Sequence, residues 1–162
     1  MNVLGIDGGS QRLGYAVLKG DRQKPEIAEA GVIRPKGKTL CEKLCYIVAD
    51  VSELLIEYQI ETLSIETAFA GPHPRAVIVL AHIRGAIIGL VPALRLNQLP
   101  TLQVVEPTPG QVKSLVTGKQ NASKQLMQQA IQWQFKLAKP PEPPDVADAI
   151  GIALWGMTVG VI

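Results

Sequence analysis

Two short hydrophobic runs in this sequence each end on a single carboxylate. The first run, residues 2–6, leads into Asp7, and the second, residues 61–65, leads into Glu66. Runs of this length that are rich in Val, Ile and Leu are typical of buried strands. If the two strands are parallel neighbours, their carboxyl ends meet at one edge of the sheet and bring the two carboxylates side by side.

A third acidic segment opens a strongly apolar stretch, residues 145–157, that we expect to be helical. Asp145 and Asp148 are three residues apart, so a helix places both on one face. Four carboxylates that converge on one point repel one another unless cations lie between them, and hard oxygen ligands of this kind suit Mg²⁺ or Mn²⁺. The pattern therefore predicts a centre for two-metal phosphodiester chemistry.

The composition limits the class of protein. The chain has 162 residues, of which 47% are hydrophobic and 19% charged, so we expect one globular domain over residues 1–162. The N-terminus lacks the pattern of a secretory signal, and the most apolar stretch, residues 76–91, is interrupted by His82 and Arg84. We therefore expect a cytoplasmic protein.

Lysine and arginine are unevenly distributed along the chain. Residues 1–66 contain eight of them against ten acids, whereas residues 67–141 contain eight against the single acid Glu106, a net charge of +7. Bracketed by the carboxylates, this basic section is a candidate surface for binding a polyanion, although ordinary solvated lysines would give the same count.

The hydrophobic periodicity predicts five strands and five helices. Strands are expected over residues 2–7, 14–19, 27–34, 61–66 and 101–105. Helices are expected over residues 40–58, 76–91, 110–116, 122–135 (with Asn121 as the N-cap) and 145–157. Early antiparallel strands followed by parallel ones fit an α/β fold, with a mixed five-stranded sheet of the ribonuclease-H-like type and helices on both faces.

The predicted helix over residues 76–91 is apolar nearly all round, so one side should pack on the sheet and the other needs a second partner. Ala81, Gly85 and Gly89 form a ridge of small residues at four-residue spacing, which lets another helix approach closely. We favour a homodimer seam here over a helix buried within one subunit.

The only two cysteines, Cys41 and Cys45, are four residues apart on a predicted helix. One interpretation is a redox or metal-binding pair. Because no further cysteine or nearby histidine completes a zinc site, we favour two small side chains on the core-facing stripe of the helix.

Several segments, taken in order, resemble the RuvC family of Holliday-junction resolvases over almost the whole chain. Each is weak alone, but together they are specific, although Gly8 stands where the family commonly has proline and the loop after Phe69 departs from the usual polar sequence. The segments are Gly5-Ile6-Asp7 with Gly9 and Gly14-Tyr15, Ile65-Glu66 with Phe69, Leu80 with Arg84-Gly85, Gln111-Val112-Lys113, Ala122-Ser123-Lys124, and residues 145–150.

The resemblance implies a structure-selective endonuclease of DNA recombination and repair. It would nick opposing strands of a four-way junction and leave 5′-phosphate and 3′-hydroxyl ends. It would act as a homodimer, with a branch-migration helicase as a further partner. The implied cofactor is Mg²⁺, about two ions per subunit, which Mn²⁺ can replace. The implied ligands are Asp7, Glu66, Asp145 and Asp148.

The same resemblance implies roles for basic and aromatic residues. Lys113 and Lys124 fall near the scissile phosphate, where they would neutralise charge in the transition state, and we count Lys124 as catalytic. Phe69 would stack on unpaired bases at the crossover. Arg75 and Lys119 complete the expected DNA-binding set.

Two other functions remain open from the sequence. The segment Asp7-Gly8-Gly9-Ser10 also resembles the first phosphate loop of actin-like and sugar-kinase ATPases, but those proteins need a second lobe for which 162 residues leave no room. The other alternative is a junction-binding protein without nuclease activity. The presence of all four carboxylates argues against it.

Overall fold

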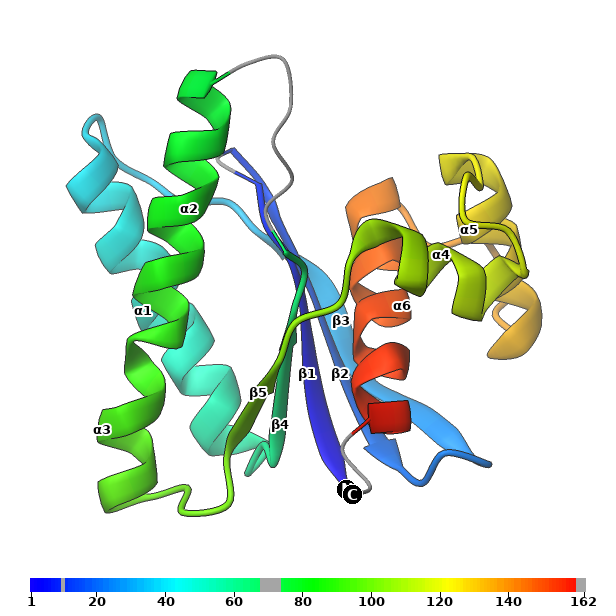
Figure 1. The fold of residues 1–162 in the computed structure, drawn as a ribbon, viewed down its shortest axis with the longest axis horizontal. Helices are drawn as coiled ribbons and strands as arrows, with labels where there is room; N and C mark the ends of the chain where they lie inside the picture. Colours follow the sequence, from blue (N-terminus) through cyan, green and yellow to red (C-terminus); the bar gives the residue numbers. More distant parts are fainter. Residues whose placement is uncertain (10, 68–73, 160–162) are drawn as a thin grey trace.

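The computed structural model describes residues 1–9, 11–67 and 74–159, and a five-stranded mixed sheet forms its centre (Figure 1). The strands are β1 (Asn2–Asp7), β2 (Leu13–Gly20), β3 (Pro25–Ile33), β4 (Thr62–Ile65) and β5 (Gln103–Val105). They lie in the order β3-β2-β1-β4-β5, antiparallel among the first three and parallel from β1 to β4 and from β4 to β5. The predicted sheet is confirmed.

Helices cover both faces of this sheet. They are α1 (Leu40–Glu57), α2 (Pro74–Ile88), α3 (Leu90–Asn97), α4 (Pro109–Thr117), α5 (Lys124–Gln134) and α6 (Pro144–Val159). Figure 1 shows α1, α2 and α3 on one side and α6 on the other, with α4 and α5 beyond α6. The central strand β1 is therefore buried on both faces, which explains its nearly continuous apolar sequence.

Alternation along β1 decides which residues face which layer. Leu4 and Ile6 pack in the core shared with α1 and α2, whereas Val3 packs in the core shared with α6. Gly5 lies on the α6 face, because a Cβ atom there would stand 2.3 Å from the carbonyl oxygen of Ala149. Since successive side chains point to opposite faces, Asp7 shares the α6 face with Val3 and Gly5.

The structure corrects the predicted helices in two places. Residues 90–97, of which only the first two fell within a predicted helix, form the separate helix α3, whose Val91 and Leu94 are buried. The predicted N-cap Asn121 is wrong: α5 begins at Lys124, and the hydroxyl of Ser123 accepts a hydrogen bond from the Leu126 amide at 3.2 Å. Both residue types cap helices well, so propensity could not decide between them.

The prediction that Cys41 and Cys45 face the core is also wrong, because both are exposed. The buried stripe of α1 runs through Ile47, Val51 and Leu54 instead. A step of four residues keeps two cysteines on one face of a helix, but it does not say which face packs on the sheet.

Candidate active site

Asp7 and Glu66 emerge side by side at the carboxyl edge of the sheet. In the parallel pair of β1 and β4, Ile6 lies opposite Ile65, and the acid is the next residue on each chain. The Glu66 amide donates a hydrogen bond to the Ile6 carbonyl at 3.3 Å. The Ser64 hydroxyl donates to the carbonyl of Ile152 in α6 at 2.8 Å, so Glu66, two residues later, also belongs to the α6 face.

The first turn of α6 lies directly over this edge. Gly14, which pairs with Asp7 in the antiparallel ladder, allows the close approach: a Cβ atom there would lie 2.3 Å from the Asp145 carbonyl oxygen. Asp145 and Asp148 therefore start from the helix face that meets the strand ends. Acids from β1, β4 and α6 are thus brought together.

The pKa values show that the four carboxylates influence one another. Burial, then Asp148, Glu66 and Asp145, raise the pKa of Asp7 to about 8. Burial, then Asp148, raise the pKa of Glu66 to about 7. Burial foremost, with a contribution from Asp145, also raises the pKa of Asp148. The charged forms are therefore unfavourable here unless a cation is supplied.

Lys113 and Lys124 oppose these shifts and so lie near the carboxylates. Lys124 lowers the pKa of Asp7, Lys113 lowers that of Glu66, and both lower that of Asp148. The two lysines reach the site because α4 and α5 rest on α6. The side chains of Val112 in α4 and Met127 in α5 come within 3.0 and 3.1 Å of the position that a Cβ atom of Gly151 in α6 would take.

The donor set fits divalent cations by type and by location. All four candidate ligands supply carboxylate oxygens, and within the described part of the chain the buried Asp145 Oδ2 atom has no hydrogen-bond partner. Among the described residues, no three acidic, histidine or cysteine side chains stand close enough to hold one ion as they are. Mutual repulsion spreads carboxylates in the absence of a cation, so an ion would draw these side chains inward.

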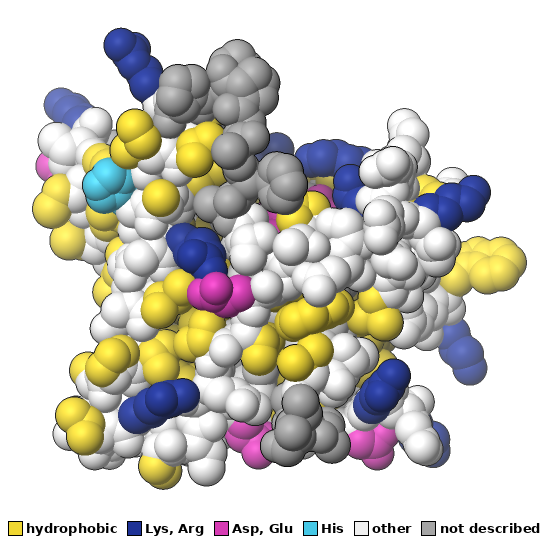
Figure 2. Space-filling model, in the orientation of Figure 1, with side chains coloured by type: hydrophobic (Ala, Val, Ile, Leu, Met, Phe, Trp, Pro, Cys, Tyr) yellow, Lys and Arg dark blue, Asp and Glu magenta, His cyan; other side chains and the backbone are white. Residues whose placement is uncertain are grey.

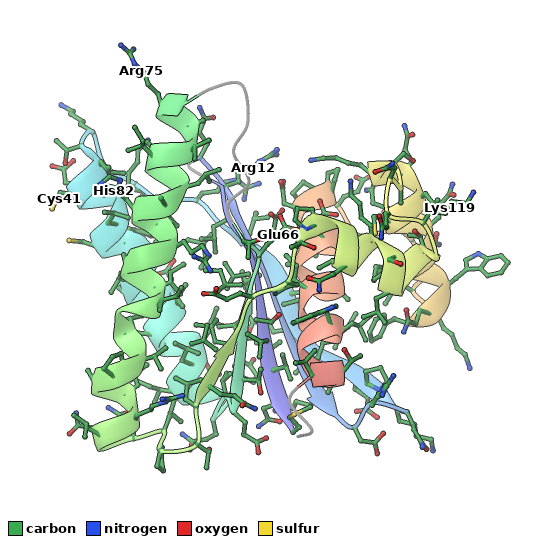
Figure 3. The ribbon with its side chains drawn as sticks, in the orientation of Figure 1. Arg12, Cys41, Glu66, Arg75, His82 and Lys119 are labelled. Atoms are coloured by element: carbon green, nitrogen blue, oxygen red, sulfur yellow. The ribbon has the colours of Figure 1, made fainter. Side chains whose placement is uncertain are left out.

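One of the carboxylates is in contact with a residue that the sequence analysis did not single out. Arg12, in the turn after β1, brings its Nη2 atom to 3.3 Å from the Oδ2 atom of Asp145. Figure 3 shows Arg12 at the same end of the sheet as Glu66. The only signal in the sequence was a cation in the turn that follows the first acidic strand.

A cavity of about 220 Å³ extends the site toward α2, with Gly8, Glu66 and Arg84 in its lining. Arg84 forms an ion pair with Glu106, the only acid of the basic middle section. The Arg84 Nε atom is buried and has no hydrogen-bond partner in residues 1–9, 11–67 and 74–159. Arg84 had no function predicted from the sequence beyond its place in a segment that resembles the family.

Of the remaining predicted residues, Arg75 and Lys119 lie away from the carboxylates, and Phe69 falls outside the described residues. Arg75 is exposed at the start of α2 and points into solvent away from Glu66 (Figure 3). Lys119 lies in the α4–α5 loop, on the far side of Glu66 from Arg75. The stacking role of Phe69 therefore stays a prediction.

Comparisons with known proteins find relatives that match almost the whole chain. The family described as crossover junction endodeoxyribonuclease RuvC matches residues 3–155. The RuvC protein of a Sulfurovum species is 35% identical over 158 residues, covering 95% of this chain and 93% of the relative. That of Chlorobium chlorochromatii is 36% identical over 161 residues, covering 99% and 81%.

Solved structures of RuvC proteins also superpose on almost the whole chain. The Thermus thermophilus RuvC structure superposes with a TM-score of 0.79 at 27% identity, covering 95% of this chain and 92% of the other. The structure of that protein in complex with a Holliday junction substrate superposes with a TM-score of 0.78 at 26% identity, covering 95% and 90%. The ribonuclease-H-like α/β fold expected from the sequence is therefore confirmed.

Proposed function

Because this chain belongs to the RuvC family of crossover junction endodeoxyribonucleases, we propose that it resolves four-way DNA junctions by nicking two opposing strands. The observation that carries the proposal is the meeting of four carboxylates from three distant segments at one edge of the sheet. The raised pKa values of Asp7, Glu66 and Asp148 mark a site that lacks positive charge. Divalent ions together with a DNA phosphate would complete it.

Asp7, Glu66, Asp145 and Asp148 would hold about two Mg²⁺ ions, which Mn²⁺ can replace. When bound, the ions would activate the attacking water and stabilise the leaving 3′ oxygen, and the products would carry a 5′ phosphate and a 3′ hydroxyl. The carboxylates orient the reacting groups, and the backbone of β1 and β4 keeps their spacing rigid. We assign these four residues as the metal ligands.

Lys113 and Lys124 would act on the scissile phosphate itself. Both lie near Asp148, Lys124 is also near Asp7, and Lys113 is also near Glu66. A phosphate bound at the carboxylates would therefore have a lysine toward each acidic strand. There the two ammonium groups would stabilise the negative charge that grows during hydrolysis.

Positive charge farther from the carboxylates suits the arms of a junction. Arg75 and Lys119 lie on opposite sides of Glu66 (Figure 3), so contacts from both would spread along the DNA rather than gather at one phosphate. Such contacts position the substrate without reading its sequence. Junction selectivity would follow from DNA shape. A branch-migration helicase stays a predicted partner.

A homodimer would supply two such sites for the two nicks. The run Arg75–Asn97 is 23 residues long and, by length and composition alone, apolar enough to cross a membrane. Only 22% of its most apolar window is buried within the subunit, so much of this apolar surface has no partner in the described residues. Ile78 is 56% exposed, and a Cβ at Gly85 would meet nothing within 4 Å. Figure 2 shows hydrophobic side chains along α2 and α3 on the face turned to the viewer. A second copy of this helix face is the proposed partner.

The dimer can be tested with matched exposed apolar residues. We expect Ile78→Arg to give a monomer in sedimentation equilibrium, because it places a charge in the proposed seam. Trp133→Arg, at an 86% exposed position on α5, should leave the dimer intact. An unchanged mass for the Ile78 variant would contradict the α2 interface.

The proposed activity is tested with a labelled four-way junction in Mg²⁺, compared with a flap and a linear duplex. We expect the native protein to nick the junction selectively. Asp7→Asn should bind it but leave it uncut, while Asp50→Asn, on α1 and outside the cluster, should cut normally. Full cutting by the Asp7 variant would reject the assignment, and binding without any cutting by the native protein would favour the non-cleaving alternative.

A further inference from the structure

The contact between Arg12 and Asp145 joins a half-exposed cation to a mostly buried ligand. The exposed fraction is 50% for the arginine side chain and 19% for the aspartate side chain. The oxygen that the guanidinium approaches, Oδ2, accepts no hydrogen bond from the described residues. This contact is therefore an ion contact without hydrogen-bond geometry, and it satisfies the carboxylate only in part.

The backbone explains why the arginine stands there. The turn folds back on itself at Gly9, where a Cβ atom would lie 2.0 Å from the Arg12 carbonyl oxygen. Gly14 lies against Asp145 on the face of the sheet that meets α6. Arg12 precedes Gly14 by two residues, so in extended chain its side chain belongs to the same face. The turn thus presents a guanidinium to a proposed metal ligand.

We propose that Arg12 competes with the divalent ion for Asp145, and that a DNA phosphate, by binding the guanidinium, releases the carboxylate to the ion. The inference rests on the proposed function, since it needs both the metal and the DNA. A guanidinium binds a phosphate through two parallel hydrogen bonds, which its contact with Asp145 does not offer. Its half-exposed side chain is accessible to a DNA strand that lies over the site.

The consequence is that metal and DNA binding strengthen each other. In the DNA-free protein, an ion must displace a cation that already contacts one of its ligands, so its affinity is reduced. Once a phosphate holds Arg12, that opposition is gone. Because coupling between two ligands is reciprocal, the ion must raise the affinity for DNA by the same factor.

The first experiment is a Mn²⁺ titration of the DNA-free full chain, followed by the paramagnetic resonance signal of the free ion. We expect Arg12→Gln to bind Mn²⁺ about threefold to tenfold more tightly than the native protein, as suits a partly exposed charge contact. Arg12→Lys keeps the charge and should stay within about twofold of the native affinity. Arg22→Gln, an equal charge change in the exposed β2–β3 turn, should leave the affinity unchanged.

If Arg12 only held Asp145 in place, Arg12→Gln would bind Mn²⁺ more weakly than the native protein, because a misplaced Asp145 is a poorer ligand. Equal or weaker binding by Arg12→Gln, with clear binding by the native protein, would overturn the competition and leave the proposed function standing. If neither protein binds Mn²⁺ and neither nicks a junction, both proposals fall together.

The second experiment measures the coupling itself. Affinity for a four-way junction is determined by fluorescence anisotropy in EDTA and in Ca²⁺, which takes the same oxygen ligands, with a denaturing gel to verify that the DNA is intact. The ratio of the two affinities should be about threefold to tenfold smaller for Arg12→Gln than for the native protein. An unchanged ratio would overturn the exchange of Arg12 between carboxylate and phosphate.

Discussion

Glu29 on β3 and Asp7 on β1 are carboxylates of the same sheet, but their surroundings shift their pKa values in opposite directions. The hydroxyls of Tyr15 and Tyr58 each donate a hydrogen bond to Glu29 at 2.6 Å, and these bonds lower the pKa of that acid. Asp7 is buried among three other acids, and burial foremost raises its pKa to about 8.

The difference distinguishes a structural carboxylate from one prepared for a ligand. At Glu29 the chain supplies its own donors, from β2 and from the end of α1, so the charge is satisfied when the protein folds. At the cluster the acids repel one another, and among the described residues two lysines and Arg12 offset them. Electrostatic strain of this kind is typical of functional sites, where an external cation relieves it.

The largest expected effect is on cleavage activity, which should depend on the carboxylate cluster and not on Glu29. We expect Glu66→Gln to lower junction cleavage by about 10³-fold or more, a loss of about 4 kcal/mol of transition-state stabilisation, because a neutral amide is a poor ligand for Mg²⁺. Glu29→Gln is the matched control and should cleave at the native rate. Rates are measured under single-turnover conditions. If the Glu66 and Glu29 variants lost the same cleavage activity, the distinction between a functional and a structural carboxylate would be wrong.

The next effect is a pH dependence of stability in EDTA. Asp7 and Glu66 hold protons in the folded protein up to pH about 8 and about 7, whereas the unfolded chain releases them near pH 4. Stability is therefore greatest at low pH in this window and falls as the pH rises through the folded values. At about 1.4 kcal/mol per pH unit for each group below its folded pKa, we expect a decrease on the order of 6 kcal/mol between pH 5 and 8 by urea unfolding.

Two additions sharpen the pH experiment. Asp7→Asn should flatten the slope, and saturating Mn²⁺ at pH 8 should restore stability, since the ion binds only the folded site. Glu29 acts in the opposite sense: its lowered pKa contributes stability that is lost only as the pH falls below the usual glutamate range. Stability that rises steadily from pH 5 to 8 in EDTA would contradict the raised pKa values.

A smaller effect is expected when the acidic turn of α6 is displaced. Gly14→Ala would place a methyl group 2.3 Å from the Asp145 carbonyl oxygen, so we expect a loss of about 1–3 kcal/mol in unfolding free energy together with impaired cleavage. Gly110→Ala, where a Cβ meets nothing within 4 Å, should change stability by no more than about 1 kcal/mol. Unimpaired cleavage by the Gly14 variant would mean that α6 need not lie so close to β2.

The smallest effect concerns the satisfied carboxylate. Tyr58→Phe removes one hydroxyl from Glu29 and should lower the unfolding free energy by about 0.5–1.5 kcal/mol with cleavage unchanged. Tyr46→Phe, on the same helix, is the control, because no hydrogen bond of its hydroxyl is present among the described residues. A double-mutant cycle with Glu29→Gln isolates the contact, and a coupling energy near zero would contradict it.

Local patterns were enough for the type and order of nearly all elements. The short, nearly continuous apolar run of β1 and the 3.6-residue period of α1 are properties of the nearby sequence, so they predict strand and helix directly. The meeting of Asp7 and Glu66 was predicted on the condition that the two strands are parallel neighbours, and the structure shows that pairing. The boundaries of α3 and the cap of α5 were missed, because several nearby residues satisfy the same local rule.

The amino-acid sequence by itself determined the mixed sheet, the acids at its edge and the family of the chain. Only the tertiary structure placed Arg12 on Asp145, beside Lys113 and Lys124, whose positions near the acids the family resemblance had implied. These partners come from segments far apart in the chain, and their meeting depends on how closely glycines such as Gly14 let α6 approach the sheet. Local propensity carries no information about such distances, because packing sets them.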